Sequence, residues 1–214
     1  MKEYENYIFD LDGTLLNTLT DLTRCCNHAL AASGFPVHKE EEVRGMVGNG
    51  IGKLIERAMP EDRLSTCYDR VLTDFRDYYL LHGLDNTLPY DGICDMLREL
   101  KRRGKKIAVV SNKIQEAASM LCDKIFGNLV DVVVGESKGI RSKPMPDMVI
   151  KAMQTIGAQN ENSVYIGDSD VDIQTARNIS LPCISVLWGF KSRQQLIDSG
   201  ATTLIEKPSE LLDF

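Results

Sequence analysis

The sequence has no long apolar segment and carries less positive than negative charge. No run approaches 18 consecutive apolar residues, so we expect no transmembrane helix. The 214 residues include 25 Lys and Arg against 31 Asp and Glu, a formal net charge of −6. Nucleic acids and anionic membranes attract proteins with a positive field, so we expect neither as a partner. The start of the chain lacks the apolar core of a signal peptide, which predicts a cytoplasmic protein.

Cysteine and histidine are scarce and poorly spaced for metal binding. The six cysteines include no C-x-x-C pair, and Cys25 and Cys26 are adjacent. We interpret them as reduced, mostly buried thiols. The three histidines show no metal-ligand spacing, and we assign them no role. The oligomeric state is left open by the sequence.

From about residue 90 onward, short apolar runs alternate with segments of helical length. We expect strands near residues 106–110, 131–135, 163–166 and 183–188, with helices between them. This alternation is typical of a parallel sheet covered by helices on both faces. The sequence therefore predicts an α/β fold with a doubly wound parallel sheet.

The segment 16–82 contains helical patterns and no convincing strand. Apolar residues recur every three or four positions in residues 19–30 and 64–79, and two shorter helices are expected at about residues 39–46 and 51–59. Residues 83–89 contain chain breakers and are interpreted as a return linker. We therefore predict two domains, an α/β core of residues 1–15 and 83–214 and an inserted helical cap of residues 16–82.

The first strand runs into a pair of carboxylates. Ile8 and Phe9 lead to Asp10, and Asp12 follows on the same face of an extended chain. Open α/β sheets bind ligands at the C-terminal edge of their strands. From these residues alone, the two acids could be a nucleophile with its acid/base partner, a pair of metal ligands, or an ordinary Asp-Gly turn.

Three later segments place polar residues at the same expected edge. Ser111 and Asp168 each follow a strand, and Lys143 lies in the loop after another. Parallel strands bring their C-terminal ends together, so we expect these side chains to converge on Asp10. Neighbouring carboxylates repel unless a cation intervenes, and oxygen ligands suit Mg²⁺. A lysine and a hydroxyl beside such a cation suit a phosphoryl group.

Four segments together resemble the motifs of the haloacid dehalogenase (HAD) superfamily. They are Asp10-Leu11-Asp12-Gly13-Thr14, Ser111-Asn112, Lys143-Pro144 and Gly167-Asp168-Ser169-Asp170-Val171-Asp172. The helical insertion is similar to the small four-helix cap of that superfamily. Within it, the chain most resembles the phosphoglycolate phosphatase-like branch. The resemblance implies a Rossmann-like HAD core with an inserted all-helical cap.

The resemblance also implies roles for the acidic residues. Asp10 would be the nucleophile that forms an aspartyl-phosphate, and Asp12 would protonate the leaving oxygen and then activate water. Mg²⁺ would be held by Asp10, by the backbone carbonyl of Asp12 and by Asp168. Asp172 would be an additional acidic partner behind these ligands.

Phosphate contacts are implied in the core and expected in the cap. The resemblance implies that Ser111 holds phosphoryl oxygens, with Asn112 beside it, and that Lys143 offsets negative charge. In the cap, we interpret the loop formed by Gly48, Asn49 and Gly50, together with Lys53 and Arg57 on the helix that follows, as substrate-binding. A flexible helix connection and a solvated helix face are the alternatives. The loop has neither of the usual nucleotide-binding glycine spacings.

These features predict a Mg²⁺-dependent phosphatase that hydrolyses a small phosphomonoester, phosphoglycolate or a similar compound, through an aspartyl-phosphate. A phosphomutase or a pyrophosphatase of the same fold is the alternative among enzymes. A regulatory protein that is phosphorylated on aspartate is the alternative from another class. Receiver domains put the acceptor on a middle strand, so the first-strand position of Asp10 and the presence of Asp12 favour an enzyme.

Overall fold

The computed structural model describes residues 3–214. The chain divides into two compact units. One is an α/β unit that contains residues up to Leu16 together with Pro89–Phe214, and the other is a helical unit that contains Asn17–Leu88. The helical unit is thus inserted in the sequence directly after the first strand of the α/β unit.

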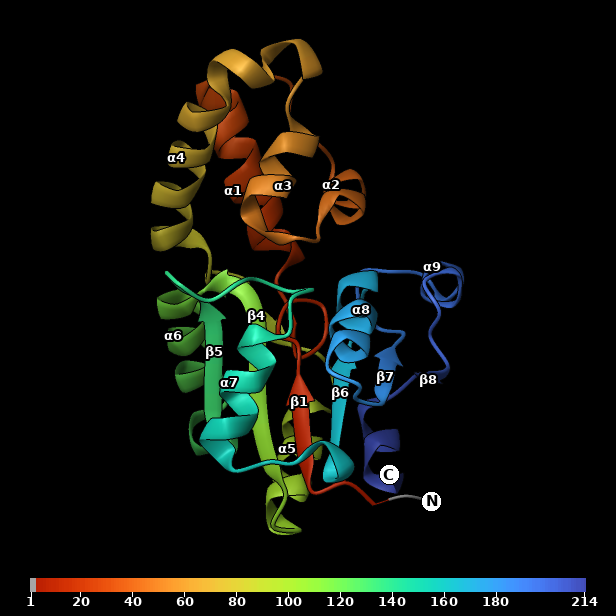
Figure 1. The fold of residues 1–214 in the computed structure, drawn as a ribbon. Helices are drawn as coiled ribbons and strands as arrows, with labels where there is room; N and C mark the ends of the chain where they lie inside the picture. The colour runs from red at the N-terminus through yellow and green to blue at the C-terminus, as the bar shows by residue number, and fades with distance from the viewer. Residues whose placement is uncertain (1–2) are drawn as a thin grey trace. The chain divides into compact units, whose positions relative to one another are not determined.

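A six-stranded parallel sheet forms the centre of the α/β unit (Figure 1). Its strand order is β5-β4-β1-β6-β7-β8, and every neighbouring pair is parallel. The strands are β1 (Asn6–Phe9), β4 (Lys106–Ile114), β5 (Val132–Glu136), β6 (Ser163–Gly167), β7 (Cys183–Val186) and β8 (Thr203–Ile205). The predicted doubly wound α/β sheet is confirmed.

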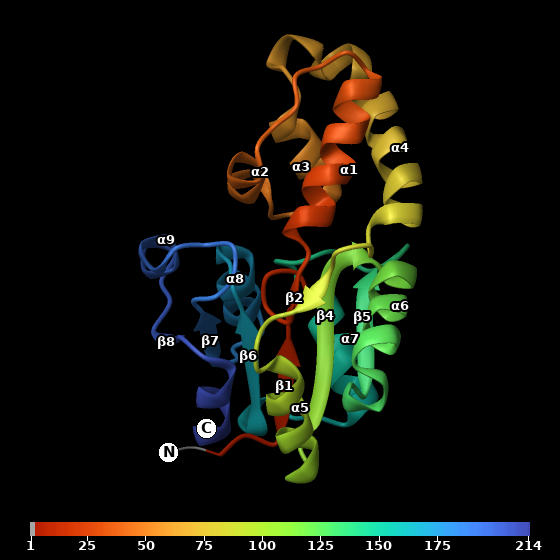
Figure 2. The same cartoon turned by 180° about the vertical axis from the view of Figure 1, so that it is seen from behind.

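Helices cover both faces of this sheet. α7 (Asp147–Ile156) and α8 (Asp170–Asn178) lie on one face (Figure 1), and α5 (Ile93–Arg102) and α6 (Gln115–Ile125) lie on the other (Figure 2). The short helix α9 (Arg193–Asp198) connects β7 to β8. Crossover helices of this kind are what parallel strands require.

Alternation along the strands divides the core between the two faces. Ile8 and Val110 belong to a cluster that also contains Met148 and Val149 of α7. Tyr7 and Phe9, which flank Ile8, point to the opposite face because successive side chains of a strand alternate. Both faces of the sheet are buried and apolar, so each strand appears in the sequence as a continuous hydrophobic segment.

Strand β4 continues further than the sequence predicts. Polar residues follow Val110, so the expected strand ends there, but β4 runs to Ile114. Between these two residues the register with β5 shifts, because four residues of β4 span two residues of β5. The strand is therefore locally irregular, as in a β-bulge, where it passes the C-terminal edge of the sheet.

The C-terminal part of the chain contains elements that the sequence analysis does not assign. They are α9, β8 and the short 3-10 helix η4 (Pro208–Asp213). β8 has only three residues, and its hydrogen-bonded partner is β7. Such short elements depend on tertiary packing, which explains why their pattern is weak.

The helical unit contains the four helices expected within residues 16–82. They are α1 (Leu19–Ala32), α2 (Glu40–Met46), α3 (Gly50–Ala58) and α4 (Leu64–His82), with a 3-10 turn η1 (Glu61–Arg63) before the last. α4 buries Val71, Phe75 and Tyr79, which are spaced by four residues and share one face. Among residues 3–214, no helix combines the length and the apolar character needed to cross a membrane.

The return segment differs from the predicted linker. Residues 83–88 belong to the helical unit, so the division falls between Leu88 and Pro89 and not at residue 83. The reason is Asp21 of α1, a buried carboxylate that accepts hydrogen bonds from the Asn86 amide at 2.9 Å and the Thr87 hydroxyl at 2.8 Å. The two short strands β2 (Leu16–Asn17) and β3 (Leu88–Pro89) contain the residues at which the chain passes between the two units, and they pair with each other.

Candidate active site

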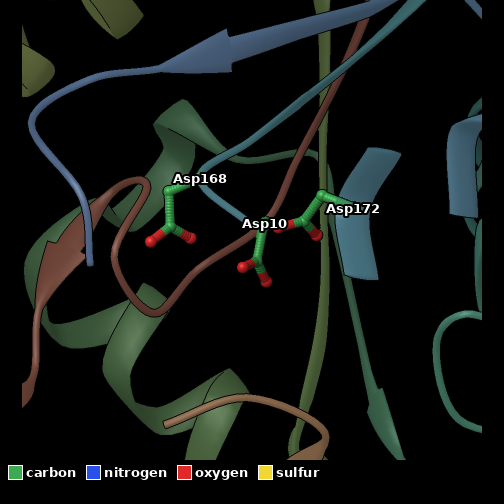
Figure 3. Close-up of side chains that lie close together, drawn as sticks. All are labelled: Asp10, Asp168 and Asp172. Atoms are coloured by element: carbon green, nitrogen blue, oxygen red, sulfur yellow. The ribbon is translucent and has the colours of Figure 1, made fainter. Parts of the chain in front are cut away.

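Three buried carboxylates converge at the C-terminal edge of the central strands (Figure 3). Asp10 directly follows β1, Asp168 directly follows β6, and Asp172 lies in the first turn of α8. One carboxylate oxygen from each residue lies within 4.8 Å of the others. Because Phe9 of β1 pairs with Ile166 of β6, Asp10 and Asp168 follow that pair by one and two residues and lie at the same end of the sheet. The predicted convergence of Asp10 and Asp168 is present, and Asp172 lies with them.

Burial and repulsion by neighbouring carboxylates disfavour the ionised forms of Asp10 and Asp168. Burial, together with the charge of Asp172, raises the pKa of Asp168 to about 7. Burial and Asp172 also hold the pKa of Asp10 well above its usual range, although Lys143 opposes them. A cation in contact with the carboxylates would remove this penalty, because opposite charge favours the ionised form.

Lys143 is the ammonium group of the cluster. Its Nζ lies 2.6 Å from Asp10 Oδ1, 2.8 Å from Asp172 Oδ1 and 3.2 Å from the Tyr165 hydroxyl. Burial by itself lowers the pKa of Lys143, but the two carboxylates outweigh it, and the pKa lies well above the ordinary value. Lys143 is therefore a permanent positive charge bound to the candidate nucleophile.

Asn112 positions the loop that carries Lys143. Its side-chain oxygen accepts from the Lys143 backbone N–H at 2.8 Å, and its side-chain nitrogen donates to the Lys143 carbonyl at 3.1 Å. Both ends of the amide are thus engaged with one residue. A direct contact between the Asn112 side chain and phosphate stays a prediction.

Asp172 is anchored by neighbours on both sides of its carboxylate. Oδ1 accepts from Lys143 and from the Tyr165 hydroxyl at 3.0 Å. Oδ2 accepts from the Ser169 hydroxyl at 2.5 Å, within a capping box that starts α8. Burial keeps the pKa of Tyr165 well above its ordinary value, so the phenol retains the proton that it donates. The sequence analysis missed Tyr165, because its place in an apolar strand reads as core.

Asp12 lies apart from the three clustered carboxylates. The Ser111 hydroxyl donates to Asp12 Oδ2 at 3.2 Å, and Lys113 Nζ lies 2.9 Å from Asp12 Oδ1. Ser111 and Lys113 are both buried in the irregular part of β4. The sequence analysis missed Lys113, although its spacing of two from Ser111 was a usable signal.

The segment after β7 orients Asp168. The Phe190 N–H donates to Asp168 Oδ2 at 2.7 Å, and the Trp188 indole donates to the Thr14 carbonyl at 2.9 Å. A Cβ on Gly189 would collide with Asp168, and so would a Cβ on Gly13. Two glycines thus allow the chain to enclose this carboxylate.

The predicted cap residues are described within the helical unit alone. Asn49 and its neighbours Gly48 and Gly50 all have positive φ, at the start of α3. Arg57 Nη1 donates to the Met46 carbonyl at 2.7 Å and to the Gly48 carbonyl at 3.0 Å. Arg57 therefore supports this loop.

Lys53 lies near the same loop and has an acidic neighbour. Its Nζ pairs with Glu56 on the exposed face of α3 at 2.6 Å. A pair of this kind is typical of a solvated helix face. The substrate contacts of the cap residues stay predictions.

Comparisons with known proteins show the family of this chain. The sequence model of the haloacid dehalogenase-like hydrolase family matches residues 7–186 of this chain. A phosphoglycolate phosphatase of Aquifex aeolicus is 30% identical over 207 residues, which cover 96% of this chain and 93% of the relative. A phosphoglycolate phosphatase of Pseudomonas putida is also 30% identical over 207 residues, which cover 92% of this chain and 74% of that protein.

A solved structure extends the similarity to the whole fold. The crystal structure of a candidate phosphoglycolate phosphatase from Lactobacillus delbrueckii subsp. bulgaricus is 36% identical and superposes with a TM-score of 0.92, covering 98% of this chain and 97% of that one. The family match spans Asp10, Ser111, Lys143 and Asp168. This chain belongs to the haloacid dehalogenase-like hydrolase family.

Proposed function

We propose that this chain is a phosphatase that hydrolyses a small phosphate monoester through an aspartyl-phosphate on Asp10. The observation that carries the proposal is the buried cluster of Asp10, Asp168 and Asp172, with Lys143 bound to the first of them. Membership of the hydrolase family supports it, and so does similarity to proteins named phosphoglycolate phosphatase. Phosphoglycolate is therefore the substrate that we propose first.

In the first step, a carboxylate oxygen of Asp10 attacks phosphorus, and the bond from phosphorus to the ester oxygen breaks. The Asp12 carboxyl gives its proton to the departing oxygen, which therefore leaves as a hydroxyl group and not as an alkoxide. Lys143 offsets negative charge next to Asp10 as the new bond forms. Assistance from a positioned acid or base is typically worth about 10²- to 10⁴-fold in rate.

In the second step, a water oxygen attacks the phosphorus of the aspartyl-phosphate. Asp12, now a carboxylate, takes a proton from that water, and the bond from phosphorus to the Asp10 oxygen breaks. Inorganic phosphate leaves, and both aspartates return to their starting states. The Ser111 hydroxyl, close to Asp12, would hold phosphoryl oxygens in both steps.

A divalent cation fits the carboxylate cluster. Three carboxylates and one ammonium leave an excess of two negative charges when all are ionised, and the acids are buried. Oxygen ligands suit Mg²⁺, which we propose is held by Asp10, the Asp12 backbone carbonyl and Asp168, with Asp172 behind them. When bound, the cation supplies charge neutralisation for the phosphoryl group. The cytoplasmic location expected from the sequence stays a prediction.

Phosphate release from a panel of phosphate esters, with and without Mg²⁺, tests the proposal. The panel contains phosphoglycolate, sugar phosphates, nucleoside monophosphates and pyrophosphate. We expect Asp10→Asn to lose more than about 10³-fold in kcat while keeping its fold, because the amide cannot act as the nucleophile. Peptide mass analysis of rapidly quenched wild type should find phosphate on Asp10.

Other outcomes would point to other functions. Activity that survives in Asp10→Asn would exclude the covalent mechanism. Exchange of phosphate between two positions of one sugar, without net release, would indicate a mutase. Phosphorylation of Asp10 without turnover would indicate a regulatory protein.

A further inference from the structure

We propose that Lys113 is a positioning residue for Asp12, and that its ammonium stabilises the negative charge that Asp12 acquires when it protonates the leaving group. The inference rests on the proposed function, because Asp12 is an acid/base only in that mechanism. It assigns a role to a buried lysine that the motifs leave without one.

Asp12 is held by two neighbours from β4. Lys113 Nζ lies 2.9 Å from Asp12 Oδ1, and the Ser111 hydroxyl donates to Oδ2 at 3.2 Å. Oδ2 therefore accepts a hydrogen bond, whereas Oδ1 has the Lys113 ammonium as an ion-pair neighbour and no hydrogen-bond donor among the described residues. The Lys113 backbone N–H donates to Ser111 Oγ at 3.1 Å, so the two partners also fix each other.

The Lys113 side chain is almost fully enclosed. It is 4% exposed, whereas the Asp12 side chain is 19% exposed. A buried ammonium is costly unless it is paired, so separating Lys113 from Asp12 would cost more free energy than separating an exposed ion pair. Asp12 keeps its access to solvent and substrate, while its counterion is shielded from water. Shielding strengthens the interaction, because the effective dielectric is lower than in water.

The irregular part of β4 places Lys113 beside Asp12. Ser111 and Lys113 are two residues apart in an extended segment, so both point to the Asp12 side. Gln115 replaces the missing ladder contacts with β5, donating to the Val133 carbonyl at 3.1 Å and accepting from the Gly135 N–H at 2.8 Å. A Cβ on Gly135 would lie 2.7 Å from the Lys113 carbonyl oxygen. The bulge thus depends on a glycine opposite Lys113.

The two buried lysines at this edge serve different carboxylates. Lys143 contacts Asp10 and Asp172, whereas Lys113 contacts Asp12. Asp12 is not in the cluster whose oxygens lie within 4.8 Å of one another. The proton carrier therefore has a counterion of its own, separate from the charge balance of the nucleophile.

This separation has a chemical consequence in the first step. The O–H bond of Asp12 breaks, the leaving oxygen takes the proton, and a negative charge remains on Asp12 beside Lys113 Nζ. An alkyl ester needs this proton, because an alkoxide is a poor leaving group. p-Nitrophenolate leaves readily as an anion and needs little acid assistance. Loss of Lys113 should therefore slow alkyl esters selectively.

The test compares kcat/KM for phosphoglycolate and p-nitrophenyl phosphate in wild type, Lys113→Met, Lys113→Arg and Lys105→Met. kcat/KM includes steps only up to departure of the leaving group, so the shared second step does not mask the difference. Lys105 is the matched control, since it is also buried and ion-paired, with Glu3 at 2.7 Å, but precedes β4 at the opposite end of the strand.

We expect Lys113→Met to lose about 10- to 100-fold with phosphoglycolate and less than about threefold with p-nitrophenyl phosphate. Lys113→Arg should restore most of the phosphoglycolate rate, and Lys105→Met should treat the two substrates alike. If another alkyl ester of the panel is hydrolysed faster by wild type, it replaces phosphoglycolate.

Equal losses on both substrates, or no loss, in folded Lys113→Met would overturn the role of Lys113. If Lys113→Met does not fold, Lys113→Gln takes its place, and failure of both to fold while Lys105→Met folds would show a structural role and overturn it too. Absence of phosphate release by wild type, or activity in Asp10→Asn, would instead refute the proposed function itself.

Discussion

At the scale of single residues, the site is a set of buried charges that each need a particular neighbour. Lys143 joins Asp10 to Asp172, and the Tyr165 hydroxyl lies between Lys143 and Asp172. A buried carboxylate that loses a hydrogen-bond donor cannot replace it with a water molecule. Single-atom changes here should therefore be measurable, although the fold is held by the surrounding core.

We expect Tyr165→Phe to lower the free energy of unfolding by about 1.5 kcal/mol and kcat by about tenfold, because a hydrogen bond to a charged group is lost. Urea unfolding and steady-state kinetics measure the two effects. The control is Tyr7→Phe in β1 of the same sheet. It loses the 2.8 Å hydrogen bond that the Tyr7 hydroxyl donates to the Phe214 carbonyl. It should lose stability but keep kcat. An unchanged kcat in Tyr165→Phe would contradict a role for this hydroxyl in placing Lys143.

At the scale of elements, loops at the C-terminal edge hold the carboxylates by backbone contacts. The segment after β7 encloses Asp168 with the Phe190 N–H and with the close approach of Gly189. In the helical unit, Asp21 binds the return segment in the same way. In both places a buried carboxylate organises a neighbouring loop, and each contact can be removed separately.

Gly189→Ala should weaken Mg²⁺ binding about 10- to 100-fold, the usual effect of disturbing the support of a metal ligand. The new Cβ would collide with Asp168 and lie 2.5 Å from the Gly13 carbonyl oxygen. Trp188 is the only tryptophan, so its fluorescence can follow a Mg²⁺ titration without activity. Gly45→Ala is the control, because a Cβ there meets nothing within 4 Å. Equal Mg²⁺ affinity in both variants would contradict the orienting role of this segment.

Asp21→Asn should loosen the helical unit. We expect a loss of about 1.5–3 kcal/mol, since the carboxylate accepts hydrogen bonds from Asn86 and Thr87 and is 1% exposed. Hydrogen exchange should become faster in residues 83–88. Asp85→Asn, which removes an exposed pair with Arg24 at 3.3 Å, should change little. Slow exchange in Asp21→Asn would show that the return segment is held by other contacts.

At the scale of the whole molecule, the charge cluster couples stability to pH and, if the proposed cation binds there, to that cation. Burial raises the pKa of Asp168 to about 7 in the folded state, while the unfolded value is about 3.9. Between these values the folded state binds the proton more tightly. Without metal, this group therefore makes the protein less stable as pH rises from about 4 to about 7. A bound cation should oppose the trend, because it favours the ionised carboxylate.

We expect saturating Mg²⁺ to raise Tm by about 5–10 °C at about pH 8. Ligand at a hundredfold excess over its Kd stabilises the folded state by roughly 2.7 kcal/mol, and each kcal/mol raises the Tm of a protein of this size by roughly 2–4 °C. At about pH 5.5 the gain should be smaller, since Asp168 must first lose a proton. Thermal unfolding with chelator and with Mg²⁺ measures both. Asp168→Asn should show little gain at either pH. A larger gain at the lower pH would contradict the assignment of Asp168 as a ligand.

Local signals in the sequence were sufficient for the fold class and for most of the site. Alternating apolar runs and helices specify a parallel sheet, and residues that follow such strands must reach one edge, which is how Asp10, Ser111 and Asp168 were found. The strand continuation to Ile114 and the C-terminal elements were not predictable in this way. They depend on hydrogen bonds to distant strands, for which a single segment carries little pattern.

Periodicity and local motifs are therefore enough to specify the α/β class, the inserted helices and the set of acids at the sheet edge. Which charges pair can be seen only in the folded structure. It assigns Lys143 to Asp10 and Asp172, Lys113 to Asp12, and Phe190 to Asp168. The partners come from separate strands and loops, and their distances depend on strand register and on a bulge that local propensity does not encode.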